Sequence, residues 1–198
     1  MVIVGITGGI GSGKGLATEF FRSRGAVIID ADEIAHELTR PKLPVLADIA
    51  DAFGQGIVRE DGSLDRGQLA RLVFGDPQAL ARLNAITHPA IRSEIERRLA
   101  RCTEEKRTHV VCIVAPLLLE AGYRESVDRL LVVAADEEER VGRVMARNGL
   151  TEEEVKKRMA AQMPPAEQTS EADWVVDTTR GQEDACRQLE GIWAELNP

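Results

Sequence analysis

The sequence predicts an α/β fold whose core is a parallel five-stranded sheet flanked by helices. Short runs of β-branched and other apolar residues recur along the chain, and most are followed by a stretch with helical spacing. Runs that stay apolar at every position are typical of strands buried on both faces, as in a parallel sheet. The length of 198 residues suits one core domain with a small insertion.

The first strand, helix and strand are expected before residue 30. Val2–Ile6 is an apolar run that ends at glycines, and Leu16–Arg24 has apolar residues at helical spacing. Gly25 suits the end of that helix. Residues 26–29 form the second apolar run. A strand, helix and strand in this order imply a parallel pair joined by a right-handed crossover.

The middle of the chain shows helical patterns and turn residues but no convincing strand. Three segments carry apolar residues at three- and four-residue spacing: Leu64–Phe74, Pro77–Thr87 and Pro89–Arg101. Proline is favoured at the first position of a helix, so Pro89 is expected to begin one, with His88 just before it. We therefore predict a core formed by residues 1–32 and 105–198, with a helical insertion at 33–104.

Strand patterns return after the insertion. Apolar runs at 110–114, 130–134 and 174–176 predict the remaining strands. Asp136 is placed to cap a helix that ends near Asn148. Thr151 and Glu154 have the spacing of a capping box and open a helix to about Gln162. A closing helix is expected over Glu183–Leu196.

A glycine-rich segment follows the first strand and has the pattern G-x-x-x-x-G-K, which predicts a phosphate-binding loop of the P-loop NTPase type. Its glycines let backbone N–H groups turn toward phosphates, and the helix that follows adds a favourable dipole. The lysine reaches the terminal phosphates of a nucleotide. We expect ATP to contact Gly8, Gly9, Gly11, Ser12, Gly13, Lys14, Gly15 and Leu16.

The residue after the lysine departs from this motif. A Ser or Thr there normally ligates Mg²⁺ through its hydroxyl, and here the position is Gly15. We expect phosphate binding to persist because the loop binds mainly through its backbone. No direct protein ligand to Mg²⁺ is expected, and the hydroxyl of Thr18 is one turn too far along. Weaker Mg²⁺ binding and slower turnover follow.

Two carboxylates follow the second predicted strand. Asp30 and Asp32 lie at its carboxyl end, the edge of an open α/β sheet where ligands bind. A carboxylate there can accept the proton of an attacking hydroxyl, as in kinases. Either residue can instead cap the next helix. Both interpretations stay open for each of them.

Composition narrows the class of protein and its partners. The net charge of −8 disfavours nucleic acid and anionic membranes as partners, and no apolar run is long enough to span a bilayer. Three scattered cysteines without metal-binding spacing fit reduced thiols. No signal peptide pattern is recognisable. We expect a cytoplasmic protein that is a monomer or a weak homo-oligomer.

Taken together, these segments resemble dephospho-coenzyme A kinases along nearly the whole chain. The phosphate loop alone is shared by many kinases, whereas the combination of four further motifs is more specific. These motifs are D-A-D at Asp30–Asp32, T-H-P at Thr87–Pro89, P-L-L-L-E at Pro116–Glu120 and A-Q-M-P at Ala161–Pro164. Leu64–Arg66 with Val73 and Phe74, and residues 172–177 also resemble family segments.

The resemblance implies ATP- and Mg²⁺-dependent phosphorylation of the ribose 3′-hydroxyl of dephospho-CoA, the last step of coenzyme A biosynthesis. It implies a helical substrate domain and a lid at about residues 140–165. Asp32 resembles the general base, and Lys14 and Arg143 the catalytic cations. Arg147 resembles a second lid arginine that binds ATP. Arg66, His88 and Pro89 join Asp32 in the implied substrate site.

Two further departures from the family lie near the expected lid and adenine pocket. Arg140 stands where Gln is frequent, and Thr178 where Asn is common. Two alternatives remain at this stage. One is a kinase of another small molecule, such as a nucleoside monophosphate. The other is a nucleotide-binding regulator whose catalysis is impaired by Gly15.

Overall fold

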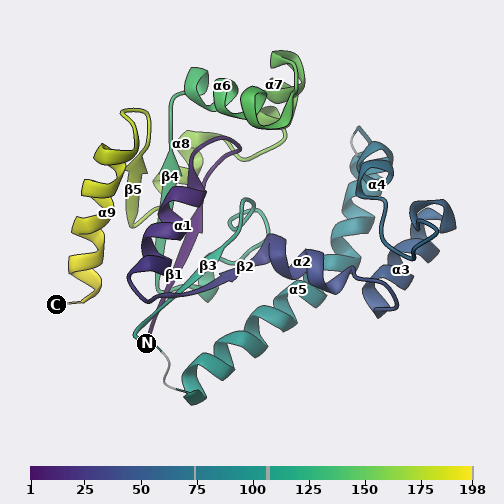
Figure 1. Ribbon diagram of the computed structural model, residues 1–198, viewed down its shortest axis with the longest axis horizontal. Coiled ribbons are helices and arrows are strands. Elements are labelled where there is room, and N and C mark those ends of the chain that lie inside the picture. The colour runs from purple at the N-terminus through teal and green to yellow at the C-terminus, as the bar shows by residue number, and fades with distance from the viewer. Residues whose placement is uncertain (74, 106–107, 198) are drawn as a thin grey trace. The chain divides into compact units, whose positions relative to one another are not determined.

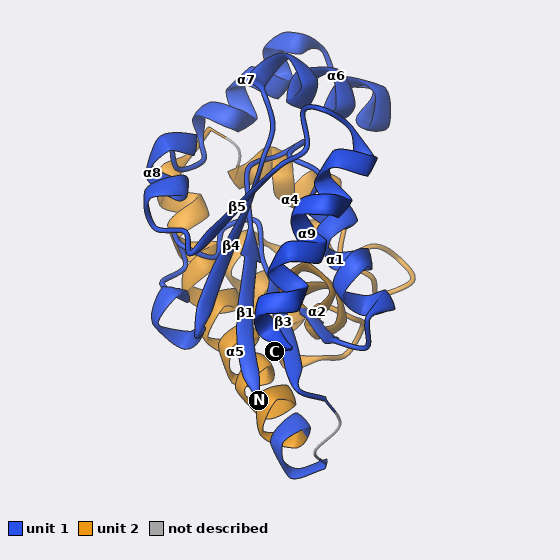
Figure 2. Ribbon diagram, turned by 90° about the vertical axis from the view of Figure 1, so that its left-hand side faces the viewer, with its two compact units in different colours: residues 1–29, 102–198 blue, residues 30–101 orange. Residues whose placement is uncertain are grey.

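The computed structural model describes residues 1–73, 75–105 and 108–197, so Phe74 lies outside the described residues. The chain divides into two compact units, shown in different colours in Figure 2. Unit 1 comprises Met1–Ile29 and Cys102–Pro198, and unit 2 comprises Asp30–Arg101. The predicted boundaries, after residues 32 and 104, each lie three residues later in the chain than the observed ones, which fall after residues 29 and 101.

Unit 1 is built on a five-stranded sheet with the order β2-β3-β1-β4-β5 (Figure 1). β1 pairs in parallel with both β3 and β4, and β4 pairs in parallel with β5. The predicted parallel sheet is therefore confirmed. The strands are β1 (Val2–Thr7), β2 (Val27–Asp30), β3 (Val110–Val114), β4 (Arg129–Ala134) and β5 (Trp174–Asp177).

Helices cover both faces of this sheet. α1 (Lys14–Ser23) and α9 (Gln182–Leu196) lie on one face, and α8 (Pro165–Ser170) lies on the other (Figure 2). Phe21 of α1 and Leu189 of α9 are fully buried in a cluster with β-strand residues. α8 has only six residues and begins at the second of two prolines, so the sequence offered too little helical periodicity to predict it.

Two further helices of unit 1 pack on each other, α6 (Glu137–Asn148) and α7 (Glu152–Ala160). The predicted capping box is confirmed, since Thr151 Oγ1 accepts from Glu154 N at 3.3 Å and Glu154 Oε2 accepts from Thr151 N at 2.8 Å. Asp136 is the N-cap of α6 but its side chain makes no capping hydrogen bond there. The prediction of a side-chain cap was therefore wrong for Asp136.

Unit 2 is mainly helical and has its own apolar core. Its helices are α2 (Ala31–Leu38), α3 (Pro44–Phe53), the short 3₁₀ helix η1 (Gln55–Ile57), α4 (Arg66–Val73) and most of α5 (Pro77–Glu105). Ile49, Leu69 and Ala79 are among the buried residues at its centre. A turn at Asp61-Gly62 folds the chain back so that Val58 and Leu64 form an antiparallel bridge. The helix predicted from Leu64 therefore begins later, at Arg66.

The expectation that Pro89 begins a helix was wrong. α5 runs unbroken from Pro77 to Glu105 and contains Pro89 in its interior. A proline there removes one helical hydrogen bond and costs about 3 kcal/mol. Leu83 and Ile86, in the turn before it, pack against the apolar core of unit 2, and this burial favours the helix despite the proline. His88 is consequently a mid-helix residue and caps nothing.

The three cysteines are unpaired thiols. Cys102 and Cys112 are buried and Cys186 on α9 is partly exposed. Cys112 lies in β3, where burial raises the pKa of its thiol to about 12. It therefore acts as a small apolar residue of the core. No helix among the described residues has the length and apolar character that crossing a membrane requires.

Candidate active site

The loop Gly8–Lys14 joins the carboxyl end of β1 to α1 (Figure 1). β1 is the central strand, with β3 on one side and β4 on the other. The chain adds β2 and β3 on one side of β1, and then β4 and β5 on the other side. In open α/β sheets, ligands bind beyond the carboxyl ends of the strands where the strand order reverses in this way. The topology thus puts the glycine-rich segment where a ligand site is expected.

Two loop glycines have no room for a side chain. Gly8 has φ of 146°, and a Cβ built on it would lie 2.2 Å from Val133 O. Gly11 has φ of 79°, and its Cβ would lie 2.5 Å from Arg140 O. Both positions combine a backbone conformation that favours glycine with contact to another backbone segment. The loop is therefore held tightly against β4 and α6.

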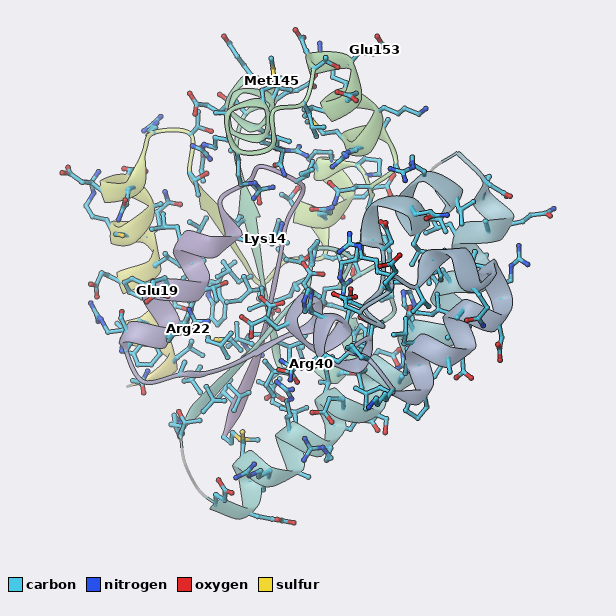
Figure 3. The ribbon with its side chains drawn as sticks, turned by 45° about the vertical axis from the view of Figure 1, so that its right-hand side comes forward. Lys14, Glu19, Arg22, Arg40, Met145 and Glu153 are labelled. Atoms are coloured by element: carbon cyan, nitrogen blue, oxygen red, sulfur yellow. The ribbon has the colours of Figure 1, made fainter. Side chains whose placement is uncertain are left out.

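Lys14 is the first residue of α1, at the end of the loop (Figure 3). Its ammonium donates to Gly8 O at 2.5 Å and to Gly9 O at 3.1 Å, so the charge lies over the loop itself. The N-cap of α1 is Gly13, and the first helical turn contains no carboxylate. A helix N-terminus without acidic residues beside an ammonium group favours an anion such as phosphate.

The peptide of Ile10 is held on both of its polar groups by residues outside the loop. Ile10 N donates to Gln162 Oε1 at 2.8 Å, and Ile10 O accepts from Arg140 Nε at 3.0 Å. The Ile10 side chain packs on the small apolar cluster of α6 and α7 that contains Val144 and Val155. The segment predicted as the lid therefore holds the phosphate loop at Ile10.

Arg140, which donates to Ile10 O, is one of the two positions near the lid where the sequence departs from the family. Its residue is only 6% exposed, and a Cβ on Gly9 would lie 2.3 Å from its Nη2. Burial lowers the pKa of the Arg140 guanidinium, an effect that nearby Glu137 opposes. The guanidinium keeps its charge at neutral pH. Arg140 thus adds a cation next to the phosphate loop.

A further hydrogen bond connects the end of the predicted lid to the segment after β3. Met163, the neighbour of Gln162, donates its N–H to Glu120 Oε1 at 3.0 Å. Glu120 closes the P-L-L-L-E motif, and Gln162 and Met163 belong to A-Q-M-P. This bond joins two motifs that are far apart in the sequence. One of them also contacts the phosphate loop, through the bond between Gln162 and Ile10. Sequence reasoning named these motifs only as family markers and did not identify their positioning role.

Arg143 and Thr178 form a second connection to the loop. Arg143 Nη1 donates to Thr178 Oγ1 at 2.7 Å, and Nη2 donates to Thr178 O at 2.8 Å. Thr178 Oγ1 in turn donates to Ser12 O at 2.8 Å. Arg143 also pairs with Glu139 at 3.3 Å. The predicted catalytic arginine therefore lies at the loop. Its Nη1 donates to Gly11 O at 3.5 Å, and Thr178, the second departure, links it to Ser12.

The other residues predicted to bind ATP are placed differently. Ser12 is buried within the loop, and Leu16 packs against the core of unit 1. Arg147 lies one turn beyond Arg143, is exposed, and donates from Nε to Asn148 Oδ1 at 2.9 Å. The structure does not bring Arg147 to the loop, and its contact with ATP stays a prediction.

The loop does not offer Mg²⁺ the usual protein ligand. Gly15 is exposed, and a Cβ there would meet no described atom within 4 Å. Thr18 Oγ1 donates back to Lys14 O at 2.9 Å within the helix. No cluster of three or more His, Cys, Asp or Glu side chains suited to a metal occurs among the described residues. The described side chains do not fit a metal held by the protein alone.

The two carboxylates after β2 have separate roles in unit 2. Asp30 is the N-cap of α2, and its Oδ1 accepts from Asp32 N at 2.8 Å and from Glu33 N at 3.3 Å. This settles the alternative for Asp30 in favour of capping. Asp32 lies in the first turn of α2 with an exposed side chain, so it is not the cap.

The remaining predicted substrate residues also lie in unit 2. Arg66 begins α4, and its Nη2 donates to Thr39 Oγ1 at 2.6 Å. His88 is half-buried within α5, where burial, and then the charge of Arg92, lower the pKa of its imidazole. The neutral imidazole is therefore favoured at neutral pH. Pro89 is exposed.

A phosphate loop after the central strand of this parallel sheet, with a cation at its end, defines a P-loop kinase fold. The family model for dephospho-CoA kinases matches residues 2–184. The chain belongs to the dephospho-CoA kinase family.

Named relatives agree with this assignment. A dephospho-CoA kinase of Geobacter sulfurreducens is 43% identical over 198 residues and is covered completely, as is this chain. A solved structure of a Thermus thermophilus protein has a TM-score of 0.85 at 40% identity and covers 100% of this chain, with 98% of its own chain matched. A Campylobacter jejuni dephospho-CoA kinase has a TM-score of 0.72 at 26% identity, covering 98% of this chain and 96% of its own. The two alternatives from the sequence, a kinase of another small molecule and an impaired regulator, are not favoured by these matches.

Proposed function

We propose that this chain transfers the γ-phosphoryl group of ATP to the ribose 3′-hydroxyl of dephospho-CoA, giving coenzyme A and ADP. The observation that carries the proposal is the phosphate loop with Lys14 inside a chain that matches this kinase family from residue 2 to residue 184. The fastening of the loop by Arg140 and Gln162 supports it, because phosphoryl transfer requires mainly positioning and positive charge.

The reaction is a single displacement at phosphorus. The 3′-oxygen of dephospho-CoA forms a bond to the γ-phosphorus of ATP, and the bond from that phosphorus to the oxygen bridging the β-phosphorus breaks, so that ADP leaves. The hydroxyl proton passes to a carboxylate, which we assign to Asp32. Asp30 is committed to capping α2 and is not assigned this role.

The cations stabilise negative charge on the transferring group. Lys14 and Arg143 are assigned to the phosphates, since their charged groups lie at the loop. Arg147 contributes when the lid closes over the nucleotide and excludes water, which limits hydrolysis of ATP. Arg66, His88 and Pro89 are assigned to dephospho-CoA.

ATP enters as its Mg²⁺ complex, with its own phosphates and water as the main ligands of the ion. This agrees with the absence of a side chain at Gly15. Location in the cytoplasm and a monomeric or weakly self-associating state stay predictions from the sequence.

The direct test measures ADP release by the full chain with Mg²⁺ and ATP, with and without dephospho-CoA, together with mass spectrometry of the acceptor. We expect ADP release that depends on dephospho-CoA and a product carrying one added phosphate. Release that is independent of dephospho-CoA, or faster with nucleoside monophosphates, contradicts the proposal.

The base is tested by a matched pair of variants. Asp32→Asn keeps the shape of the side chain but cannot accept the proton, so kcat should fall by about 100-fold or more. Glu33→Gln removes the neighbouring exposed carboxylate and should leave kcat nearly unchanged. Equal losses in the two variants contradict the assignment of Asp32.

A further inference from the structure

Unit 2 contains a cleft with a volume of about 230 Å³ that is lined by basic side chains. His36, Arg40, Arg59 and Arg66 contribute to its wall, and none of its lining residues is acidic. The chain as a whole has a net charge of −8, so this concentration of arginine runs against its composition. Pockets for whole drug-sized ligands measure roughly 300–1,000 Å³, and this cleft therefore suits one charged group of a larger ligand.

The guanidinium of Arg66 is held in place by a buried hydroxyl. Its Nη2 donates to Thr39 Oγ1 at 2.6 Å, and Thr39 is only 6% exposed. Thr39 Oγ1 in turn donates to Ala35 O at 2.7 Å, so the hydroxyl is fixed on α2, and the bond from Arg66 connects the end of α2 to the start of α4. A guanidinium carries five N–H donors in a fixed fork, and the bond to Thr39 fixes its orientation.

Arg59 is positioned by the turn that precedes α4. Its backbone N–H donates to Ser63 O at 2.8 Å, and its carbonyl accepts from Gly62 N at 2.9 Å, next to the bridge between Val58 and Leu64. Its Nε pairs with Asp65 Oδ2 at 3.6 Å. A short fixed turn therefore presents Arg59 beside Arg66.

Arg40 completes the cleft from the segment that follows α2, where Figure 3 labels it. Among the described residues, no carboxylate forms an ion pair with Arg40 or with Arg66. Three arginines in one small cleft therefore meet a single partner carboxylate, that of Asp65. The uncompensated positive charge favours an anionic ligand, and arginine matches phosphate oxygens with two parallel hydrogen bonds.

We propose that this cleft binds the 5′-diphosphate of the acceptor, with Arg40 and Arg59 acting beside Arg66. The inference rests on the proposed function and specifies how its acceptor is selected. The diphosphate is the only anionic group of dephospho-CoA, since the adenosine and the pantetheine arm are uncharged. The cleft would then favour acceptors that carry a 5′-diphosphate over acceptors that lack one.

The test measures KM for dephospho-CoA and KM for ATP with the full chain. Arg40→Ala and Arg59→Ala should each raise KM for dephospho-CoA by about tenfold, because each removes a charge-assisted contact. KM for ATP and kcat should stay nearly constant, as expected when ground state and transition state lose the same contact. Arg71→Ala on α4 removes an exposed arginine outside the cleft and serves as the matched control.

A binding series separates charge recognition from a loss of structure. With the phosphate loop saturated by a non-hydrolysable ATP analogue, adenosine, AMP and ADP are compared for displacement of dephospho-CoA. Affinity should rise along this series in the natural chain and stay flat in the Arg40→Ala/Arg59→Ala variant. An equal rise in both overturns the inference while leaving the proposed function intact. If the natural chain does not phosphorylate dephospho-CoA at all, the proposed function fails and the inference falls with it.

Discussion

Replacing Gly15 by serine should increase the rate of phosphoryl transfer. The position lies in the first turn of α1, is exposed, and has no described atom within 4 Å of an added Cβ. Its φ is not among the positive values of this chain, so a side chain causes no backbone strain. Serine is therefore accommodated, and its hydroxyl restores the oxygen that the motif places next to Mg²⁺.

The size of the effect can be divided into stability and catalysis. Glycine inside a helix costs about 0.8–1.0 kcal/mol relative to alanine, and serine lies between them. Gly15→Ser should therefore raise Tm by about 1–2 °C and Gly15→Ala by about 2–4 °C. Losing a residue that supports a metal ligand typically lowers metal affinity by about 10–100-fold. We expect a gain near the lower limit, about tenfold, because phosphates and water supply the other ligands.

Gly15→Ala is the control that gains the helix stability without the hydroxyl. The assay titrates Mg²⁺ at fixed ATP and dephospho-CoA, and records kcat and the Mg²⁺ concentration at half-maximal rate for the three proteins. Only the serine variant should show a higher kcat or a lower half-maximal concentration. If serine and alanine behave alike in both quantities, the reasoning about Gly15 is refuted.

Three further predictions concern other parts of the molecule. Arg143→Ala should lower kcat by about 100-fold or more while circular dichroism shows a retained fold, and near-natural kcat would remove Arg143 from the mechanism. Gln162→Leu leaves Ile10 N without its acceptor and should weaken ATP binding and lower stability by about 1–3 kcal/mol, whereas Gln162→Glu keeps an acceptor and should restore affinity in a calorimetric titration. Hydrogen bonds from Arg97 and then Arg98 lower the pKa of Glu94 from 4.5 to about 2. Because the folded-state pKa is the lower one, Glu94 stabilises the fold above about pH 4.5 and the contribution is lost as pH falls toward 2. Glu94→Gln should therefore destabilise by about 1 kcal/mol at pH 7, and thermal unfolding should show the difference shrinking through that interval.

Local chemistry explains which parts of the fold were predictable. The apolar runs of β1, β3 and β4 are buried on both faces, so their strand pattern needs no knowledge of the partners. The Thr151–Glu154 capping box depends on residues three positions apart and is equally visible in the sequence. The phosphate loop was predictable for the same reason, since its chemistry is contained in consecutive residues.

The parts that were missed depend on contacts between distant segments. The continuity of α5 through Pro89 reflects the packing of Leu83 and Ile86 on the core of unit 2, which outweighs a local rule. The fastening of Ile10 joins residues that are 130 and 152 positions apart, and no local pattern encodes it. Asp30 and Asp32 are chemically equivalent in the sequence, and only the backbone geometry of α2 distinguishes the cap from its neighbour.

The placement of the cysteines makes the natural chain suited to single-site fluorescent labelling. A maleimide reacts with a thiolate, and burial withholds both Cys102 and Cys112 from the reagent. Cys186, partly exposed on α9, is the thiol that remains accessible, and it lies on an element of unit 1 distant in sequence from the phosphate loop. A donor dye at Cys186 paired with an acceptor introduced at an exposed position of α7 would follow lid movement by energy transfer without removal of any natural residue of the loop.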